Sequence, residues 1–370
     1  MKKSFFYEDT YTWCLRIWFD VLTPKQVMFF KYAVELLRQR DYEVLCTARN
    51  YRECVRLARL KKFELRLVGR HGGSSKYDKL RASSIRIFDL AKEIERFNPD
   101  LCISFSSPEA ARVAFGLGIP HITFSDSPHA QAVQKLTIPF VNYLLCPWII
   151  PYSAWDNLGI SRNQIVRYRA LDPVAWLRKE TKNIDSAKLK KKYQLSKSNT
   201  FVIRPEESKA SYLIDKANNN VNDILKSIVQ NFHDTTNILV LCRYQDQMIQ
   251  FKEKYGDKIR VLEKVVDGLE LISVADIFIG GGGTMTAESA LLGKPTISIS
   301  PIKFYVDDYL VKTGLIYKIG NPAQIVKRLR RIQSDNLFRL RQKNRAQHIL
   351  NRMEDPANKL LKIVGKFVSL

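Results

Sequence analysis

The chain has 370 residues, of which 45% are hydrophobic and 11% aromatic. This apolar content can fill cores, so the composition excludes a disordered protein, and the length indicates two domains. With 60 Lys and Arg against 37 Asp and Glu, the net charge of +23 favours nucleic acid, a phosphate-bearing substrate or acidic lipid as partner, although a basic solvated surface would also explain it.

Cysteine usage and hydropathy indicate the cellular compartment of the protein and its relation to membranes. The six cysteines lie mostly in strand-like apolar contexts without CxxC or zinc spacing, which indicates reduced core residues of a cytoplasmic protein. No segment approaches the roughly 18 uninterrupted apolar residues of a spanning helix, and acidic residues interrupt any signal-like start. We therefore expect a cytoplasmic protein, in which any contact with the inner face of the cell membrane is peripheral.

Short apolar runs alternate with longer amphipathic segments along the first half of the chain, after an N-terminal extension over residues 1–13. Strands are predicted at residues 14–22, 42–49, 64–69, 101–107, 120–126, 143–148 and 165–171. Thr23 and Pro24 are expected to open the helix that follows the first strand. Strands joined by helices predict a parallel sheet, so residues 14–175 are interpreted as an N-terminal Rossmann-like domain.

The charged stretch 176–199 is predicted to link two domains, although a surface helix within one larger domain would have the same composition. The alternation then restarts, with strands predicted at residues 200–205, 237–242, 258–264, 276–281, 295–300 and 315–320. Residues 200–345 are therefore interpreted as a second Rossmann-like domain. The segment 346–370 carries apolar helical faces that we expect to dock back on the domains.

Four consecutive glycines separate the predicted strand 276–281 from a helix that starts at Thr284. Ligands of open parallel sheets bind at the carboxyl ends of strands, where a helix presents unpaired N–H groups, and glycines let a phosphate approach the backbone. The spacing matches neither the GxGxxG fingerprint nor a P-loop. Glu288, in the second turn of the helix, could accept hydrogen bonds from two ribose hydroxyls. The predicted nucleotide diphosphate site comprises Gly281, Gly282, Gly283, Thr284, Met285 and Glu288, with a tight packing turn as the alternative.

Polar residues follow several predicted strands of the first half. Asp126 and His129 follow the strand 120–126, and either could act as general base toward an acceptor hydroxyl. Asp20, at the end of the first strand, could serve likewise. The alternatives are a structural Asp–His pair and, for Asp20, a helix cap.

Further cationic and loop residues are predicted to contact the ligands. Arg204 and Lys209 follow the strand 200–205 and could neutralise the diphosphate, unless they belong to the abundant surface Arg and Lys. Contacts with the acceptor or a phosphate are predicted for Arg70, His71, Gly72 and Asp308. A plain turn is the alternative for the loop that contains His71.

Two wound halves with a Gly-Gly-rich turn and a helical Glu resemble the GT-B superfamily, which includes the peptidoglycan N-acetylglucosaminyltransferase and UDP-N-acetylglucosamine 2-epimerase. That resemblance implies that the turn holds the diphosphate of a nucleotide sugar and that Glu288 holds its ribose. A closer resemblance, between residues 18 and 309, is to the family domain of unknown function 354. It is carried by the stretches WFDVLTPKQVMFFK, GRHGG, PDLCISFSSPEAARVAFGLGIPHITFSDSPHA, VIRPE and VDGLELISVADIFIGGGGTMTAESALLGKP.

The chain departs from these families at positions that matter for chemistry. Gln26 stands where the family usually has a His, and Ser107 stands where the epimerases have an Asp. The segment IRPEES lacks the His of the epimerases. These departures disfavour epimerisation by the proton-shuttling route of those enzymes.

The sequence therefore predicts an α/β protein of GT-B type, with an N-terminal acceptor domain and a C-terminal donor domain facing a central cleft. The leading function is transfer of sugar from a nucleotide diphosphate-sugar to an unidentified acceptor, without a cofactor or metal, because the helix dipole and Arg204 would stabilise the leaving diphosphate. A nucleotide-sugar 2-epimerase or hydrolase is the alternative. A non-catalytic binding protein is the second, with acidic membrane favoured over nucleic acid because the basic helices carry no aromatic stacking platform.

Overall fold

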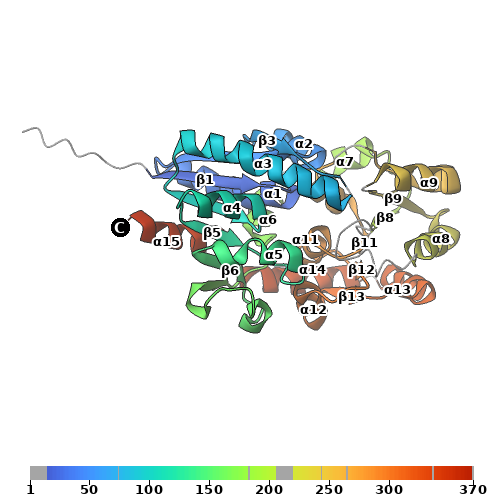
Figure 1. Cartoon of the computed structure of the whole chain (residues 1–370). Coiled ribbons are helices and arrows are strands. Elements are labelled where there is room, and N and C mark those ends of the chain that lie inside the picture. Colours follow the sequence, from blue (N-terminus) through green and yellow to red (C-terminus); the bar gives the residue numbers. More distant parts are fainter. Residues whose placement is uncertain are drawn as a thin grey trace, which may run out of the picture.

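The computed structural model describes residues 15–73, 75–181, 184–205, 220–242, 244–263, 266–335 and 337–368. These residues form two parallel β-sheets with helices packed around them, one sheet in each half of the chain (Figure 1). The first sheet has the strand order β3-β2-β1-β4-β5-β6-β7, and the second has the order β10-β9-β8-β11-β12-β13. Both orders are of the doubly wound type, in which the strand order reverses beside the first strand of the sheet.

The first half contains seven strands and six α-helices within the described residues. The strands are β1 (Arg16–Val21), β2 (Glu43–Asn50), β3 (Arg66–Arg70), β4 (Leu101–Phe105), β5 (His121–Phe124), β6 (Tyr143–Pro147) and β7 (Ile165–Tyr168). The helices are α1 (Pro24–Arg38), α2 (Arg52–Leu60), α3 (Lys76–Phe97), α4 (Pro108–Gly116), α5 (Gln131–Lys135) and α6 (Val174–Glu180). Short 3₁₀ helices span Ile138–Phe140, Tyr152–Trp155 and Arg162–Gln164.

The second half adds six strands and nine α-helices over the described ranges. The strands are β8 (Asn199–Arg204), β9 (Thr236–Val240), β10 (Arg260–Val261), β11 (Ile277–Gly280), β12 (Thr296–Ser298) and β13 (Ile316–Lys318). The helices are α7 (Ser186–Lys192), α8 (Asn220–Phe232), α9 (Gln245–Tyr255), α10 (Gly268–Val274), α11 (Thr284–Leu291), α12 (Tyr305–Lys312), α13 (Pro322–Ser334), α14 (Phe338–Asn351) and α15 (Pro356–Val368). A 3₁₀ helix spans Gly256–Lys258.

Local sequence explains where the elements begin. Nearly every residue of β1 is buried, as expected for a central parallel strand covered on both faces. Pro24 opens α1, but the Thr23 side chain makes no capping hydrogen bond, so the predicted cap is a backbone position only. At α4 the Ser107 hydroxyl does cap, accepting from the N–H of Ala110. Of the predicted strand 258–264, the structure shows only the two residues of β10, because Lys258 belongs to the preceding 3₁₀ helix and Lys264 lies outside the described residues.

Apolar packing joins the end of the chain to its beginning. Leu360, Ile363 and Val364 of α15 are buried in one core with Phe30 and Val34 of α1. Figure 1 shows α15 beside the first sheet, far along the sequence from it. No helix of the described residues has both the length and the apolar character needed to cross a bilayer.

Candidate functional site

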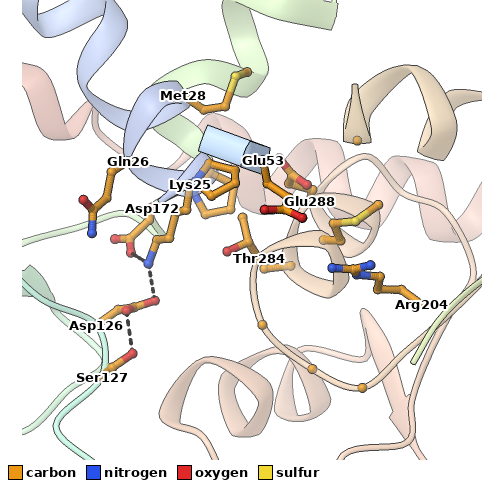
Figure 2. A pocket seen from close by; sticks show the side chains of 18 of the residues that line it. Lys25, Gln26, Met28, Glu53, Asp126, Ser127, Asp172, Arg204, Thr284 and Glu288 are labelled. Carbon is orange, nitrogen blue, oxygen red and sulfur yellow. Dashed lines mark hydrogen bonds and ion pairs between the residues drawn. The ribbon is translucent and has the colours of Figure 1, made fainter. Parts of the chain in front are cut away.

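A cavity of about 550 Å³ lies between the two halves of the chain. Its lining residues follow the carboxyl ends of strands in both sheets, and its volume is within the roughly 300 to 1,000 Å³ of small-molecule sites. Figure 2 shows residues of the first half, such as Lys25 and Asp126, on one side of it and Thr284 and Arg204 on the other. We call these two sides the N-wall and the C-wall.

The C-wall is built on the glycine turn after β11. Gly280 ends that strand in register with Arg204 at the end of β8, so the turn lies where the strand order reverses. Gly282 and Gly283 have φ values of +89° and +80°, and a Cβ on Gly282 would come within 3.2 Å of the Phe304 ring. Within the described residues no side chain caps the first turn of α11. A bare turn and open helix start are the features that accept a phosphate.

The residues predicted for the diphosphate are brought together. The cavity is lined by Gly281, Gly282, Gly283, Thr284, Met285, Glu288 and Arg204. The Arg204 guanidinium donates a 2.8 Å hydrogen bond to the carbonyl of Leu241, which holds the guanidinium at the edge of the cavity. Lys209 lies outside the described residues.

Glu288 is buried in the C-wall and is held by a residue of the other half. The indole N–H of Trp176, on α6, donates a 2.8 Å hydrogen bond to Glu288 Oε1. Burial raises the pKa of Glu288 to about 8, so its carboxyl is mostly protonated at neutral pH. A protonated carboxyl can still accept from, or donate to, a sugar hydroxyl. Trp176 was not predicted, because the sequence assigned it to the linker.

The N-wall contains a lysine between two aspartates. The Lys25 ammonium, in the first turn of α1, lies 2.6 Å from Asp126 Oδ2 and 2.6 Å from Asp172 Oδ2. Lys25 and Asp172 were not predicted, although both follow strand ends. His129 lines the same wall, with its ring centroid 4.7 Å from that of Phe304. Burial lowers the pKa of His129, so the imidazole is neutral at pH 7.

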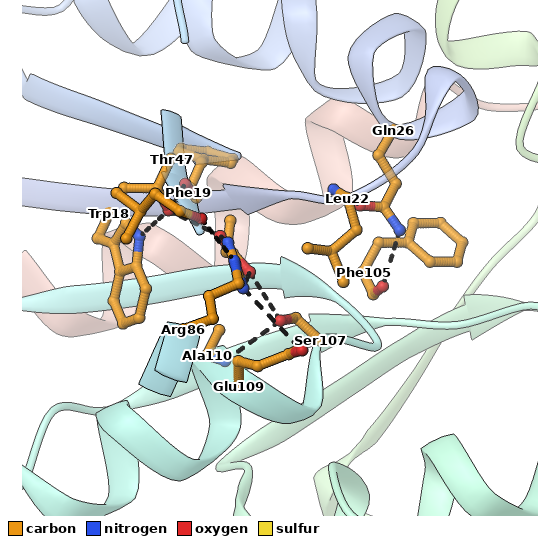
Figure 3. A network of polar contacts seen from close by, with 12 residues as sticks. Trp18, Phe19, Leu22, Gln26, Thr47, Arg86, Phe105, Ser107, Glu109 and Ala110 are labelled. Atoms are coloured by element: carbon orange, nitrogen blue, oxygen red, sulfur yellow. Dashed lines mark hydrogen bonds and ion pairs between the residues drawn. The ribbon is translucent and has the colours of Figure 1, made fainter. Parts of the chain in front are cut away.

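Asp20 is not part of this wall, which corrects its prediction as a base. It is completely buried and receives two hydrogen bonds from Arg86, at 2.6 and 3.1 Å, and one each from the hydroxyls of Thr47 and Ser107. Figure 3 shows Arg86, Thr47 and Ser107 converging in this network. Despite burial, Arg86 holds the pKa of Asp20 below its usual range. A carboxylate with four donors and no contact with the cavity stabilises the fold rather than accepting a substrate proton.

The other predicted contacts also lie outside the cavity lining, namely Arg70, His71, Gly72 and Asp308. His71 stacks on Tyr51, with ring centroids 4.9 Å apart. A Cβ on Gly72 would lie 2.6 Å from the backbone of Lys79, so this glycine serves the close packing of its loop on α3. The neighbour of Asp308, Asp307, lines the cavity instead and accepts a hydrogen bond from Ser298.

Two Rossmann-like halves that enclose a ligand-sized cavity at their strand ends define a protein of the GT-B fold class. Within that class, the chain belongs to the family described as Protein of unknown function (DUF354), whose model matches residues 15–368. Both predictions, of fold and of family, are confirmed. An uncharacterised protein of Methanocaldococcus jannaschii is 32% identical over 319 residues, covering 84% of this chain and 90% of that protein.

Solved structures with the same fold are more distant in sequence. A putative UDP-N-acetylglucosamine 2-epimerase from Listeria monocytogenes has a TM-score of 0.74 at 12% identity, covering 94% of both chains. The Methanocaldococcus jannaschii UDP-N-acetylglucosamine 2-epimerase, in complex with UDP-N-acetylglucosamine and UDP, has a TM-score of 0.69 at 15% identity, covering 95% of this chain and 100% of that one. The glycotransferase of kitacinnamycin has a TM-score of 0.59 at 12% identity, covering 95% and 98%. These likenesses establish the fold.

Proposed function

We propose that the chain binds a nucleoside diphosphate-sugar in this cavity and transfers the sugar to an acceptor hydroxyl. The observation that carries the proposal is that the bare turn at Gly282, the open start of α11 and Glu288 line one wall of a cavity whose other wall holds Asp126. The turn and helix start suit a diphosphate, and Glu288 suits the ribose. A fold relative in complex with UDP makes UDP the first ligand to test.

The proposed reaction uses the two walls for different tasks. Amide groups at the start of α11 and the Arg204 guanidinium would stabilise charge on the leaving diphosphate, without a cofactor or metal. Asp126 would accept the proton of the attacking hydroxyl, with neutral His129 beside it in the N-wall. Closure of the halves would exclude water.

An epimerase or hydrolase is the alternative that the fold relatives favour, since several are UDP-N-acetylglucosamine 2-epimerases. At the position where the resemblance places their Asp, this chain has Ser107, whose buried hydroxyl donates to Asp20. A proton shuttle through that position would therefore lack its carboxylate. Consumption of UDP-N-acetylglucosamine by the purified protein in water alone would favour the alternative over transfer.

UDP is expected to raise the melting temperature of the wild-type protein, and Glu288→Ala to abolish most of that rise. A ligand at 100 times its Kd stabilises the folded state by about 2.7 kcal/mol, and most of this is lost when removal of the ribose contact raises the Kd toward the ligand concentration. Differential scanning fluorimetry against UDP, GDP and dTDP measures the effect. Glu270→Ala, on α10 at a half-buried position outside the cavity lining, is the matched control and should keep the full rise. A rise that survives Glu288→Ala would remove Glu288 from the site.

Peripheral contact with acidic membrane is proposed for the outer face of α3. Tyr77, Leu80 and Phe88 are 73%, 67% and 62% exposed there, and Lys92 lies over the Phe88 ring at 4.1 Å. Apolar side chains among cations fit the headgroup region of anionic bilayers. Cosedimentation with phosphatidylserine vesicles is expected to fall with salt and with Leu80→Glu. Leu60→Glu, at the exposed end of α2, should have no effect, and equal loss in both variants would contradict this docking face.

A further inference from the structure

The N-wall contains a polar cluster in which three distant segments of the chain meet. It consists of Lys25 from α1, Asp126 after β5, and Asp172 and Tyr168 at the end of β7, and we call it the Lys25 cluster. The Tyr168 hydroxyl donates to Asp172 Oδ1, and the Ser127 hydroxyl donates to Asp126 Oδ1 at 2.8 Å. Each carboxylate therefore has its own hydroxyl donor, and the two share one ammonium.

The two carboxylates of the Lys25 cluster differ in access to the cavity. The side chain of Asp126 is 22% exposed, whereas that of Asp172 is 2% exposed. The Lys25 ammonium also lies 4.3 Å from the centre of the Phe105 ring, so it is fixed from a third side. Asp126 can therefore reach a ligand, and Asp172 acts on it through Lys25.

The charges around Asp172 oppose one another. The groups that face it are the Lys25 ammonium from α1, the Asp126 carboxylate after β5, the Tyr168 hydroxyl on β7 and, at longer range, the Cys146 thiol on β6. Burial, with the negative charge of Asp126, raises the pKa of Asp172 to about 6, although Lys25 and Tyr168 oppose the rise. Against burial, Lys25 holds the pKa of Asp126 below its usual range. The cluster thus carries one net negative charge at neutral pH.

We propose that Asp126 and Asp172 form one proton-transfer unit bridged by Lys25, in which Asp126 takes the proton of the acceptor and Asp172 is a positioning residue. The inference rests on the proposed function. The acceptor oxygen bonds to the sugar's anomeric carbon, the bond from that carbon to the diphosphate oxygen breaks, its electron pair leaves with the diphosphate, and the hydroxyl proton moves to Asp126.

The shared lysine sets the strength of the base. An ammonium divided between two carboxylates stabilises the charge of Asp126 less than one paired with Asp126 alone, so Asp126 stays more basic. When Asp172 takes up a proton below about pH 6, the ammonium acts fully on Asp126 and weakens it. The negative cluster would also repel an anionic group, so the acceptor group that enters here is a neutral hydroxyl rather than a carboxylate or phosphate.

The test is a pH titration of the protein labelled with [4-¹³C]aspartate, followed by NMR. One carboxyl is expected to titrate with a midpoint of about 6 and to disappear in Asp172→Asn. Lys25→Met should raise this midpoint and Asp126→Asn should lower it, each by about 1 to 3 units, because the two neighbours act with opposite sign. Lys25→Arg, which keeps the positive charge, should leave the midpoint of Asp172 close to its wild-type value.

The directions in which the midpoint of Asp172 shifts in these variants decide the proposal. Equal midpoints in Lys25→Met and Asp126→Asn, or no aspartate that titrates between pH 5 and 7, would overturn it. Tyr168→Phe removes only a hydroxyl that lowers the midpoint, so a rise is expected there too, and this variant keeps the sign test available if Lys25→Met fails to fold. Titration calorimetry with UDP separates the two proposals. No UDP binding by the wild type would reject the proposed function. UDP binding, together with midpoints that do not change in the Lys25→Met and Asp126→Asn variants, would reject only the proton-transfer unit.

Discussion

Replacing Arg86 by methionine is expected to lower the free energy of unfolding by about 3 to 5 kcal/mol. The Arg86 side chain is 1% exposed and makes two hydrogen bonds to Asp20 and a third, of 3.0 Å, to the carbonyl of Val68. Methionine fills similar space but leaves the Asp20 carboxylate buried without its cation. Unfolding in guanidinium chloride, followed by circular dichroism, measures the loss.

Arg66→Met is the matched control for this prediction. Arg66 is 58% exposed and pairs with Glu93 at 2.8 Å, so its removal should cost about 0 to 1 kcal/mol. The pH dependence gives a second readout. Because the pKa of Asp20 is lowered on folding, its stabilisation is present above its unfolded pKa near 4 and is lost as the pH falls below it. The difference between wild type and Arg86→Met should therefore shrink in acid. Equal costs for Arg86→Met and Arg66→Met would contradict the assigned role.

Asp126→Asn is expected to lower kcat for sugar transfer by about 100-fold to 10,000-fold, the usual contribution of a general base. Asparagine keeps the size of the side chain and an oxygen for Lys25 and Ser127, but it cannot take a proton. Release of UDP from a turned-over UDP-sugar measures the change, and UDP affinity should stay within about twofold because Asp126 lies on the wall opposite the proposed diphosphate site.

Asp156→Asn, at an exposed turn, is the control for this variant and should retain full activity. His129→Gln separates Asp126 from His129, the two of the three predicted bases that line the cavity. A larger loss of kcat in His129→Gln than in Asp126→Asn would transfer the role of base to the imidazole.

The C-wall could be predicted from the sequence because its signals are local. The strand, the turn at Gly282, the helix and Glu288 follow one another within a dozen residues, so their spacing alone places them at one helix mouth. The alternation of strands and helices predicted both sheets for the same reason. At β10, the predicted run was longer than the strand, because its first residue, Lys258, belongs to a 3₁₀ helix.

The N-wall could not be predicted in the same way. Lys25 meets Asp126 and Asp172 only after β1, β5 and β7, with β4 and β6 between them, have been placed in one sheet. Their separations in sequence of 101 and 147 residues leave no local pattern. For Asp20, the local signal was misleading. Its position at a strand end predicted that it would line the cavity. In the sheet it lies beside Thr47 and Ser104, and α3 brings Arg86 to it from 66 residues away.

The start of α6 gives the molecule a physical link between its two walls. Asp172 and Trp176 are four residues apart, about one helical turn, yet one belongs to the Lys25 cluster and the other reaches Glu288. The indole hydrogen bond engages Oε1, so this contact between the halves fixes the rotamer of the carboxyl before a nucleotide arrives. Ligand binding then costs less side-chain entropy, because the Glu288 side chain is already ordered in the free protein. A nucleotide that contacts Oε2 would in return stabilise the contact between the two halves.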